Sequence, residues 1–136
     1  MKPYNLDHIA IAVHDLDEAI DRHRTLFGAE PHSRELVAEQ GVEEAMIALG
    51  GSNVQLIAPT HPDAPVARFL AKRGEGLHHV AYAVTDIEQA LAELESKGAR
   101  LVDTVPRNGG RGARIAFVHP AAFAGTLVEL VELPYE

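Results

Sequence analysis

The chain has 136 residues, of which 46% are hydrophobic and none is cysteine, so it has the length of one domain and no disulfide framework, cysteine-ligated zinc site or thiol nucleophile. Its formal net charge of −8 excludes binding to nucleic acid or to an anionic membrane surface through the overall field. The lack of cysteine fits a cytoplasmic protein, and the sequence shows neither the apolar run of a signal peptide nor that of a membrane span.

The first predicted elements are a strand near residues 8–13 and a helix that follows it. The strand alternates a branched face with a face of small residues and a histidine: Ile9, Ile11 and Val13 against His8, Ala10 and Ala12. The helix has Asp15 as its N-cap, with Glu18 three residues later, and Gly28 as its stop signal. Its apolar stripe consists of Leu16, Ala19, Ile20, Leu26 and Phe27.

Three runs near residues 34–39, 43–49 and 53–58 are predicted to be strands that complete the first half. In the second run, Ala45, Ile47 and Leu49 share one face, which we expect to pack against the helix. Glu44 then points to the opposite, cleft face, while Glu43 and a surface role for Glu44 stay open as alternatives. A short helix over residues 63–74 links this half to the next.

The rest of the chain repeats this order. Residues 6–19 align without gaps to residues 77–90, and seven of the fourteen positions are identical. The repeated helix begins after Asp86 and ends at Gly98, and strands are predicted near residues 100–104, 114–118 and 126–132. We therefore predict an α+β fold with two βαβββ halves, at about 5–60 and 76–134, in a single domain over residues 1–136. Curved mixed or antiparallel sheets are expected to surround a cleft.

Polar residues at matching points of the two halves predict a metal site. His8 matches His79, Gln55 matches Glu129, and all four interrupt apolar runs. A buried polar group without a partner costs roughly 1–3 kcal/mol, so four of them at related positions call for a shared partner. Two imidazoles, a carboxylate and an amide oxygen suit a divalent ion. His79 is favoured over its neighbour His78 because it has the strand parity of His8.

Six of the twelve Lys and Arg residues fall in two short segments, although the chain is acidic. Each one alone is an ordinary surface charge, but as groups they are candidates for binding the phosphates of an anionic substrate. The groups are Arg68, Lys72 and Arg73, then Arg107, Arg111 and Arg114. His119, which ends a predicted strand near the cleft, is a further candidate.

Six longer segments indicate a protein family more specifically than single residues do. They are Asp7–Val13, Glu39–Val42, Val54–Pro59, Phe69–His79, Arg114–Pro120 and Leu127–Leu130. Together with the repeat they resemble the vicinal oxygen chelate superfamily and, within it, the methylmalonyl-CoA epimerase family. The resemblance implies the metal ligands His8, Gln55, His79 and Glu129 and a pair of acid/base glutamates, Glu44 and Glu129. It implies a divalent ion, Co²⁺ first and Mn²⁺, Ni²⁺, Zn²⁺ or Fe²⁺ as alternatives, as well as a homodimer.

The activity implied by the resemblance is interconversion of (2R)- and (2S)-methylmalonyl-CoA, by removal and return of the α-proton through an enolate. The sequence departs from the family pattern at Arg111 in the loop 107–114 and at residues 121–124, which leaves the acyl group of the acyl-CoA substrate open. Three alternatives remain: a lactoylglutathione lyase-like isomerase, an extradiol-type dioxygenase that uses iron, and a metal-free protein that binds a small molecule.

Overall fold

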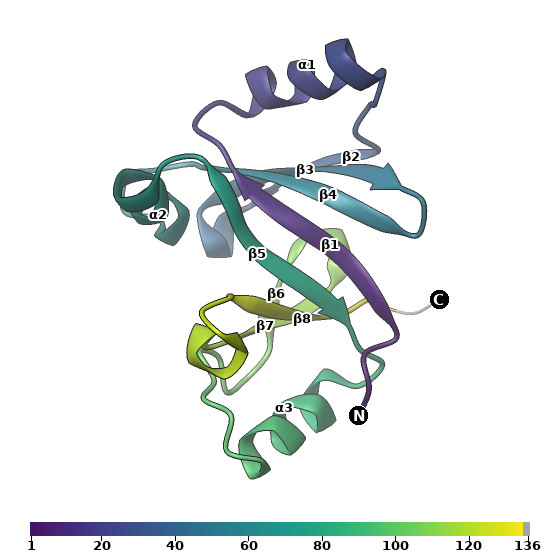
Figure 1. Cartoon of the computed structure of the whole chain (residues 1–136), viewed down its shortest axis with the longest axis vertical. Helices are drawn as coiled ribbons and strands as arrows, with labels where there is room; N and C mark the ends of the chain where they lie inside the picture. The colour runs from purple at the N-terminus through teal and green to yellow at the C-terminus, as the bar shows by residue number, and fades with distance from the viewer. Residues whose placement is uncertain (135–136) are drawn as a thin grey trace. The chain divides into compact units, whose positions relative to one another are not determined.

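The computed structural model describes residues 1–134 (Figure 1). The strands are β1 (Asn5–Ala12), β2 (Ser33–Val37), β3 (Val42–Leu49), β4 (Ser52–Pro59), β5 (Gly76–Ala83), β6 (Arg107–Asn108), β7 (Arg114–Val118) and β8 (Val128–Glu132). The helices are α1 (Leu16–Phe27), α2 (Pro65–Arg73) and α3 (Ile87–Ser96), with short 3₁₀ helices η1 (Ala38–Gln40), η2 (Gly110–Gly112) and η3 (Pro120–Phe123). No helix within the described residues has the length and apolar character needed to cross a membrane.

The chain forms two compact units. The terminal unit consists of Met1–His8 and the chain from His79 onward, and the central unit consists of Ile9–His78. Strand order is β2-β3-β4-β1 in the central unit, which holds the second half of β1 from Ile9, and β5-β8-β7-β6 in the terminal unit, which holds β5 from His79. The two predicted βαβββ patterns are therefore present, as β1-α1-β2-β3-β4 and β5-α3-β6-β7-β8.

The central unit is built around the antiparallel pairs β2–β3 and β3–β4. Because neighbouring residues of a strand point to opposite faces, β4 contributes to two cores. Helix α1 covers one face of the sheet, as Figure 1 shows, with a core that includes Leu16, Ile20, Ala45, Ile47 and Leu56. Helix α2 packs on the other face, with a core that includes Val42, Ile57, Val66 and Leu70.

The predicted ends of α1 are confirmed, but part of its predicted apolar stripe is wrong. Asp15 accepts a hydrogen bond from the backbone N–H of Glu18 at 3.0 Å, and Gly28 ends the helix in the left-handed region with φ of 68°. Phe27, however, is 81% exposed, and Leu26 is exposed as well. The sheet supports only the first half of the helix, where its buried residues lie.

Strand β3 presents its two faces largely as predicted. Ala45 and Ile47 lie in the core under α1, and Glu44 is buried on the other face. Leu49 is 58% exposed, contrary to the prediction, because it pairs with Ser52 at the end of the β3–β4 hairpin, beyond the helix.

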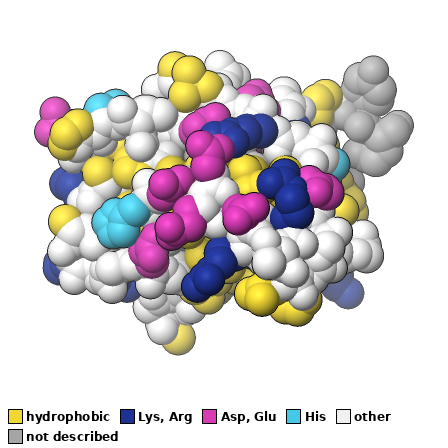
Figure 2. All heavy atoms as spheres, turned by 90° about the horizontal axis from the view of Figure 1, so that it is seen from above, with side chains coloured by type: hydrophobic (Ala, Val, Ile, Leu, Met, Phe, Trp, Pro, Cys, Tyr) yellow, Lys and Arg dark blue, Asp and Glu magenta, His cyan; other side chains and the backbone are white. Residues whose placement is uncertain are grey.

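Exposed charges on the central unit neutralise one another, and Figure 2 shows acidic and basic side chains side by side on one face of the molecule. Arg34 lies 2.6 Å from Asp17 and 2.8 Å from Glu43, and Arg24 lies 2.7 Å from Glu30. Such exposed pairs contribute little to stability, typically about 0.2–1 kcal/mol each.

The terminal unit has a mixed sheet: β5 runs parallel to β8, whereas β8–β7 and β7–β6 are antiparallel. Helix α3 begins as predicted, because Asp86 accepts a hydrogen bond from the backbone N–H of Gln89 at 3.0 Å. It packs on the sheet with a core that includes Ile87, Leu91, Ala116, Val118 and Leu130.

The prediction of a strand at residues 100–104 is wrong. Only Leu101 forms an isolated bridge, to Val118, and the edge strand β6 lies later, at Arg107–Asn108. The Asp103 carboxylate accepts the backbone N–H of Phe117 at 2.8 Å, and the Phe117 carbonyl accepts two consecutive N–H groups, those of residues 102 and 103. A side chain thus takes the place of a backbone acceptor, and the ladder is interrupted.

Candidate metal centre and active site

Three of the four predicted metal ligands meet in the terminal unit. His8 Nε2 lies 3.1 Å from Glu129 Oε1, His79 Nε2 lies 3.3 Å from the same oxygen, and the two Nε2 atoms are 3.3 Å apart. All three residues are at most 5% exposed. The predicted preference for His79 agrees with this geometry, since His78 belongs to the central unit and packs its ring edge-to-face against Phe69.

Strand parity explains why these side chains converge. Glu129 on β8 is the register partner of Ala81 on the parallel strand β5, and His79 lies two residues before Ala81 on the same face. Ala81 is fully buried and small, which leaves room for the imidazole rings and the carboxylate. The ring of Phe117 packs edge-to-face on His79 at 5.2 Å between centroids and restrains its orientation.

The electrostatics of the cluster favour a bound cation. Burial raises the pKa of Glu129, but the charge and hydrogen bond of His79, with the hydrogen bond of His8, outweigh this and lower it to about 2. Burial lowers the pKa of His8, but its hydrogen bonds to Asp7 and Glu129 outweigh this and raise it to about 9. Without a metal ion, the site therefore retains a proton on His8 to balance the buried carboxylates.

The donor atoms also have the spacing that one divalent ion requires. Ligand atoms about 2.1 Å from an ion lie about 3.0 Å apart at a right angle and about 3.4 Å apart at a tetrahedral angle. The three observed separations, 3.1, 3.3 and 3.3 Å, fall between these limits. His8, His79 and Glu129 form a group that could hold a metal ion.

The remaining predicted ligand, Gln55, lies in the central unit beside the predicted base, Glu44. Gln55 on β4 is the register partner of Met46 on β3, and Glu44 is two residues from Met46 on the same face. The Gln55 amide donates a hydrogen bond from Nε2 to Glu44 Oε2 at 3.1 Å. Both side chains are 6% exposed, so this is a buried amide–carboxylate pair.

The cations predicted to bind substrate phosphates fall into two structural settings. In the central unit, Arg68, Lys72 and Arg73 lie on α2. Lys72 and Arg73 belong to its last turn, and Arg68 donates to the Asp63 carbonyl at 2.5 Å. The Arg73 guanidinium lies 5.8 Å from the centre of the Phe69 ring. Their role in binding a substrate stays a prediction.

In the terminal unit the three predicted arginines all form ion pairs. Their acidic partners are Asp103 for Arg107, Asp7 for Arg111, and Glu88 with Glu132 for Arg114. His119 caps η3, where its Nδ1 accepts the backbone N–H of Ala121 at 3.0 Å. A substrate-binding role for these residues also stays a prediction.

Sequence reasoning missed Asp7, which is 3% exposed and contacts the candidate ligand His8. Strand alternation places adjacent residues on opposite faces, so strand parity does not predict this contact. The Asp7 Oδ2 atom nevertheless lies 2.6 Å from His8 Nδ1. The available signal was an acid immediately before a predicted ligand inside an otherwise apolar strand.

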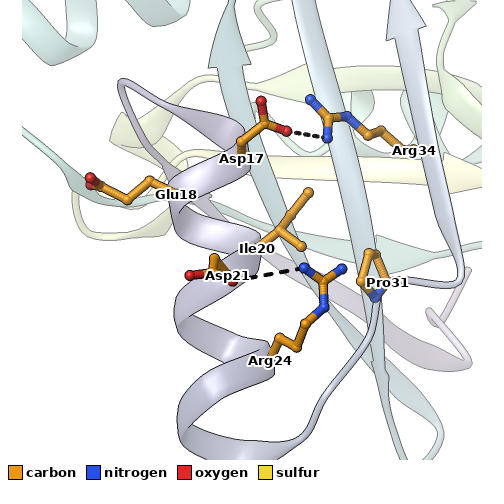
Figure 3. Close-up of a pocket in the computed structure, with 7 residues that line it drawn as sticks. All are labelled: Asp17, Glu18, Ile20, Asp21, Arg24, Pro31 and Arg34. Carbon is orange, nitrogen blue, oxygen red and sulfur yellow. Dashed lines mark hydrogen bonds and ion pairs between the residues drawn. The ribbon is translucent and has the colours of Figure 1, made fainter.

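A hollow beside α1 lacks the features of a reactive site (Figure 3). It has a volume of about 590 Å³ and is lined by Asp17, Glu18, Ile20, Asp21, Arg24, Pro31 and Arg34. Figure 3 shows Arg34 turned toward Asp17 and Arg24 toward Asp21, and these pairs measure 2.6 and 3.9 Å. The arginines of this hollow are thus paired with acids of the same unit.

Known proteins are similar to this chain in sequence and in fold. Residues 7–117 match the glyoxalase/bleomycin resistance protein/dioxygenase superfamily. The ethylmalonyl-CoA/methylmalonyl-CoA epimerase of Cereibacter sphaeroides is 37% identical over 130 residues, which cover 94% of this chain and 97% of that protein. A variant of the Streptomyces coelicolor methylmalonyl-CoA epimerase, in complex with 2-nitronate-propionyl-CoA, has a TM-score of 0.94 and 40% identity over 98% of this chain and 96% of that chain.

A methylmalonyl-CoA epimerase in complex with methylmalonyl-CoA and NH4⁺ also has a TM-score of 0.94 and 40% identity, over 98% of this chain and 96% of that chain. These similarities confirm the vicinal oxygen chelate fold that the repeat and the resemblance predicted. The chain belongs to the glyoxalase/bleomycin resistance protein/dioxygenase superfamily and, within it, to the methylmalonyl-CoA epimerase family.

Proposed function

We propose that the protein is a metal-dependent methylmalonyl-CoA epimerase that interconverts the (2R) and (2S) forms of its substrate. The observation that carries the proposal is the buried His8, His79 and Glu129 triangle, in a chain similar over nearly its whole length to named epimerases. A reaction of this kind must stabilise negative charge next to a thioester, and a buried cation site supplies that stabilisation.

The metal site would use four residues of this chain. His8, His79 and Glu129 offer two ring nitrogens and a carboxylate oxygen, and Gln55 would add its amide oxygen. Since Gln55 donates through Nε2 to Glu44, Oε1 is the atom that it would offer as a ligand. We propose Co²⁺ as the ion; two imidazoles with two oxygen donors also suit Mn²⁺, Ni²⁺, Zn²⁺ or Fe²⁺.

Glu44 and Glu129 would exchange the α-proton on opposite faces of the substrate. A divalent ion acts as a Lewis acid that stabilises negative charge on a carbonyl oxygen. The hydrogen bond from Gln55 orients the Glu44 carboxylate and holds it ready to accept a proton. In each turnover one glutamate would remove the α-proton and the other would return a proton to the opposite face, so both would be required, and Glu129 would also bind the ion.

The substrate would be an acyl-CoA whose phosphates are bound by cations of this chain. The candidates are Arg68, Lys72, Arg73, Arg107, Arg111, Arg114 and His119. The relative from Cereibacter sphaeroides is named for both ethylmalonyl-CoA and methylmalonyl-CoA. We propose methylmalonyl-CoA as the preferred substrate, with ethylmalonyl-CoA as the first analogue to compare.

Deuterium exchange at C2 of methylmalonyl-CoA tests the proposal most directly. The protein is incubated in D₂O with each pure epimer, with Co²⁺ or with EDTA, and deuterium at C2 is followed by mass spectrometry. We expect exchange that depends on metal and accompanies formation of the other epimer. Stoichiometric metal without exchange would point to another reaction of the superfamily, and absence of bound metal would point to a metal-free binding protein.

Assembly and location are separate proposals. We propose that the protein is a homodimer, as the resemblance implies, and light scattering during size-exclusion chromatography measures this directly. The cytoplasmic location expected from the sequence stays a prediction, which fractionation of the source cells would check.

A further inference from the structure

Asp7 is placed to control how His8 presents its ring. The Asp7 Oδ2 atom lies 2.6 Å from His8 Nδ1, so Nδ1 carries the hydrogen and donates it. The opposite ring nitrogen, Nε2, then faces Glu129 Oε1 at 3.1 Å. A carboxylate behind a ligand histidine fixes the tautomer and the ring orientation and makes the ligand more basic.

Asp7 is itself held by Arg111, which lies 104 residues away in the sequence. The guanidinium donates from Nη2 to Asp7 Oδ2 at 2.5 Å and from Nη1 to Oδ1 at 3.4 Å. This two-pronged contact suits a planar guanidinium and fixes the plane of the carboxylate.

The backbone of the loop around Arg111 is fixed by hydrogen bonds and by packing, which keeps the guanidinium beside Asp7. Arg111 has φ of 59° and ψ of 23°, a left-handed conformation that residues other than glycine adopt rarely. The loop is closed by hydrogen bonds from the Gly109 N–H to the Ala113 carbonyl and from the Ala113 N–H to the Gly110 carbonyl. A Cβ on Gly109 would lie 2.8 Å from Ile115 Cγ2, so the loop packs tightly on β7.

We infer that Arg111 and Asp7 are positioning residues for the metal ligand His8: Arg111 fixes Asp7, and Asp7 fixes the ring of His8. The inference rests on the metal site of the proposed function. It assigns Arg111, a residue that departs from the family's sequence pattern, to the metal centre instead of to the phosphates of the substrate.

The variant R111G tests this role without straining the loop backbone, because glycine suits a φ of 59° better than arginine does. We expect its affinity for Co²⁺ alone, measured by competition with a chelator, to fall about 10–100-fold. The visible absorption of bound Co²⁺ should change as the His8 ring is released, and R111K should give intermediate values. R114M is the matched control, since Arg114 pairs with Glu88 and Glu132, and its Co²⁺ affinity should equal that of the wild type.

A double-mutant cycle with D7A separates an indirect effect from a direct one. If Arg111 acts through Asp7, R111G should weaken Co²⁺ binding in the wild-type background and have no further effect in D7A. Equal Co²⁺ affinity and an unchanged spectrum in R111G would overturn the inference. So would a raised KM for methylmalonyl-CoA with unchanged Co²⁺ affinity, because the guanidinium would then serve the substrate.

The Co²⁺ affinities and spectra do not depend on the epimerase reaction. Wild-type protein that binds Co²⁺ but does not exchange the C2 proton would contradict the proposed activity, and the affinities would still decide the role of Arg111. Wild-type protein that binds no Co²⁺ would overturn the inference together with the metal site.

Discussion

Gln55 donates a hydrogen bond of 3.1 Å to Glu44, and both side chains are buried. One amide thereby connects the two functions predicted for this part of the chain, since its oxygen is the proposed metal ligand and its nitrogen orients the proposed base. Glu43, the neighbour of Glu44 on β3, points to the other face and binds Arg34 at the surface. The two glutamates form a natural pair for comparison.

We predict that E44Q lowers the epimerisation rate on the order of 10²–10⁴-fold, because an amide cannot accept the α-proton. Its metal content should equal that of the wild type, since Glu44 is not a proposed ligand. The measurement is deuterium exchange at C2, with metal analysis of the same samples. E43Q is the control and should keep its activity; full activity in E44Q would remove Glu44 from the mechanism.

Replacement of Gln55 should affect both metal and catalysis. Q55A removes a proposed ligand atom and the hydrogen-bond donor of Glu44, so we expect weaker Co²⁺ binding and slower exchange even at saturating Co²⁺. The control is N53A, two residues earlier on the same face of β4, where Asn53 pairs with His32 at 2.8 Å. Unchanged Co²⁺ affinity in Q55A would exclude Gln55 as a ligand.

Metal should stabilise the fold through the histidine pair. An ion that binds only the folded state contributes about 2.7 kcal/mol when its concentration is 100 times its Kd. Calorimetry with Co²⁺ and with EDTA should therefore show a higher Tm for the metal-loaded wild type. H79A should lose this difference, and H78A should keep it, because His78 packs on Phe69 instead. A metal-dependent Tm that survives in H79A would contradict the site.

The metal-free protein should become less stable as pH rises from 6.5 to 9. Burial lowers the pKa of His8, but the hydrogen bonds to Asp7 and Glu129 raise it to about 9, from 6.5. Between these values the folded state keeps a proton that the unfolded chain has released, so up to roughly 3 kcal/mol of stability, present in full below pH 6.5, is lost. Glu129, with its pKa of about 2, contributes its own loss only in acid, below its ordinary value of 4.5.

Urea unfolding of EDTA-treated protein at several pH values measures this dependence. H8Q is the control and should flatten the profile between pH 6.5 and 9, because it removes the titrating ring. A flat profile in the wild type would show that His8 holds no extra proton in the folded state.

Much of the site followed from the sequence because strand parity and an internal repeat are local properties. His8 and His79 are 71 residues apart, but each occupies the same position in its half, and Glu129 was found as the repeat partner of Gln55. The helix caps Asp15 and Asp86 could also be predicted from the sequence, since a cap depends on residues only three positions away.

Only the tertiary structure decided how far packing extends and which distant groups meet. Phe27 has the right helical phase, but it lies beyond the part of α1 that the sheet supports. Residues 100–104 were predicted to form a strand, but the Asp103 side chain accepts a backbone hydrogen bond there and interrupts the ladder. The contact of Arg111 with Asp7 joins residues 104 positions apart through an unusual backbone conformation. Periodicity carries no information about such a contact, because it depends on the path of a loop and not on the pattern of any one element.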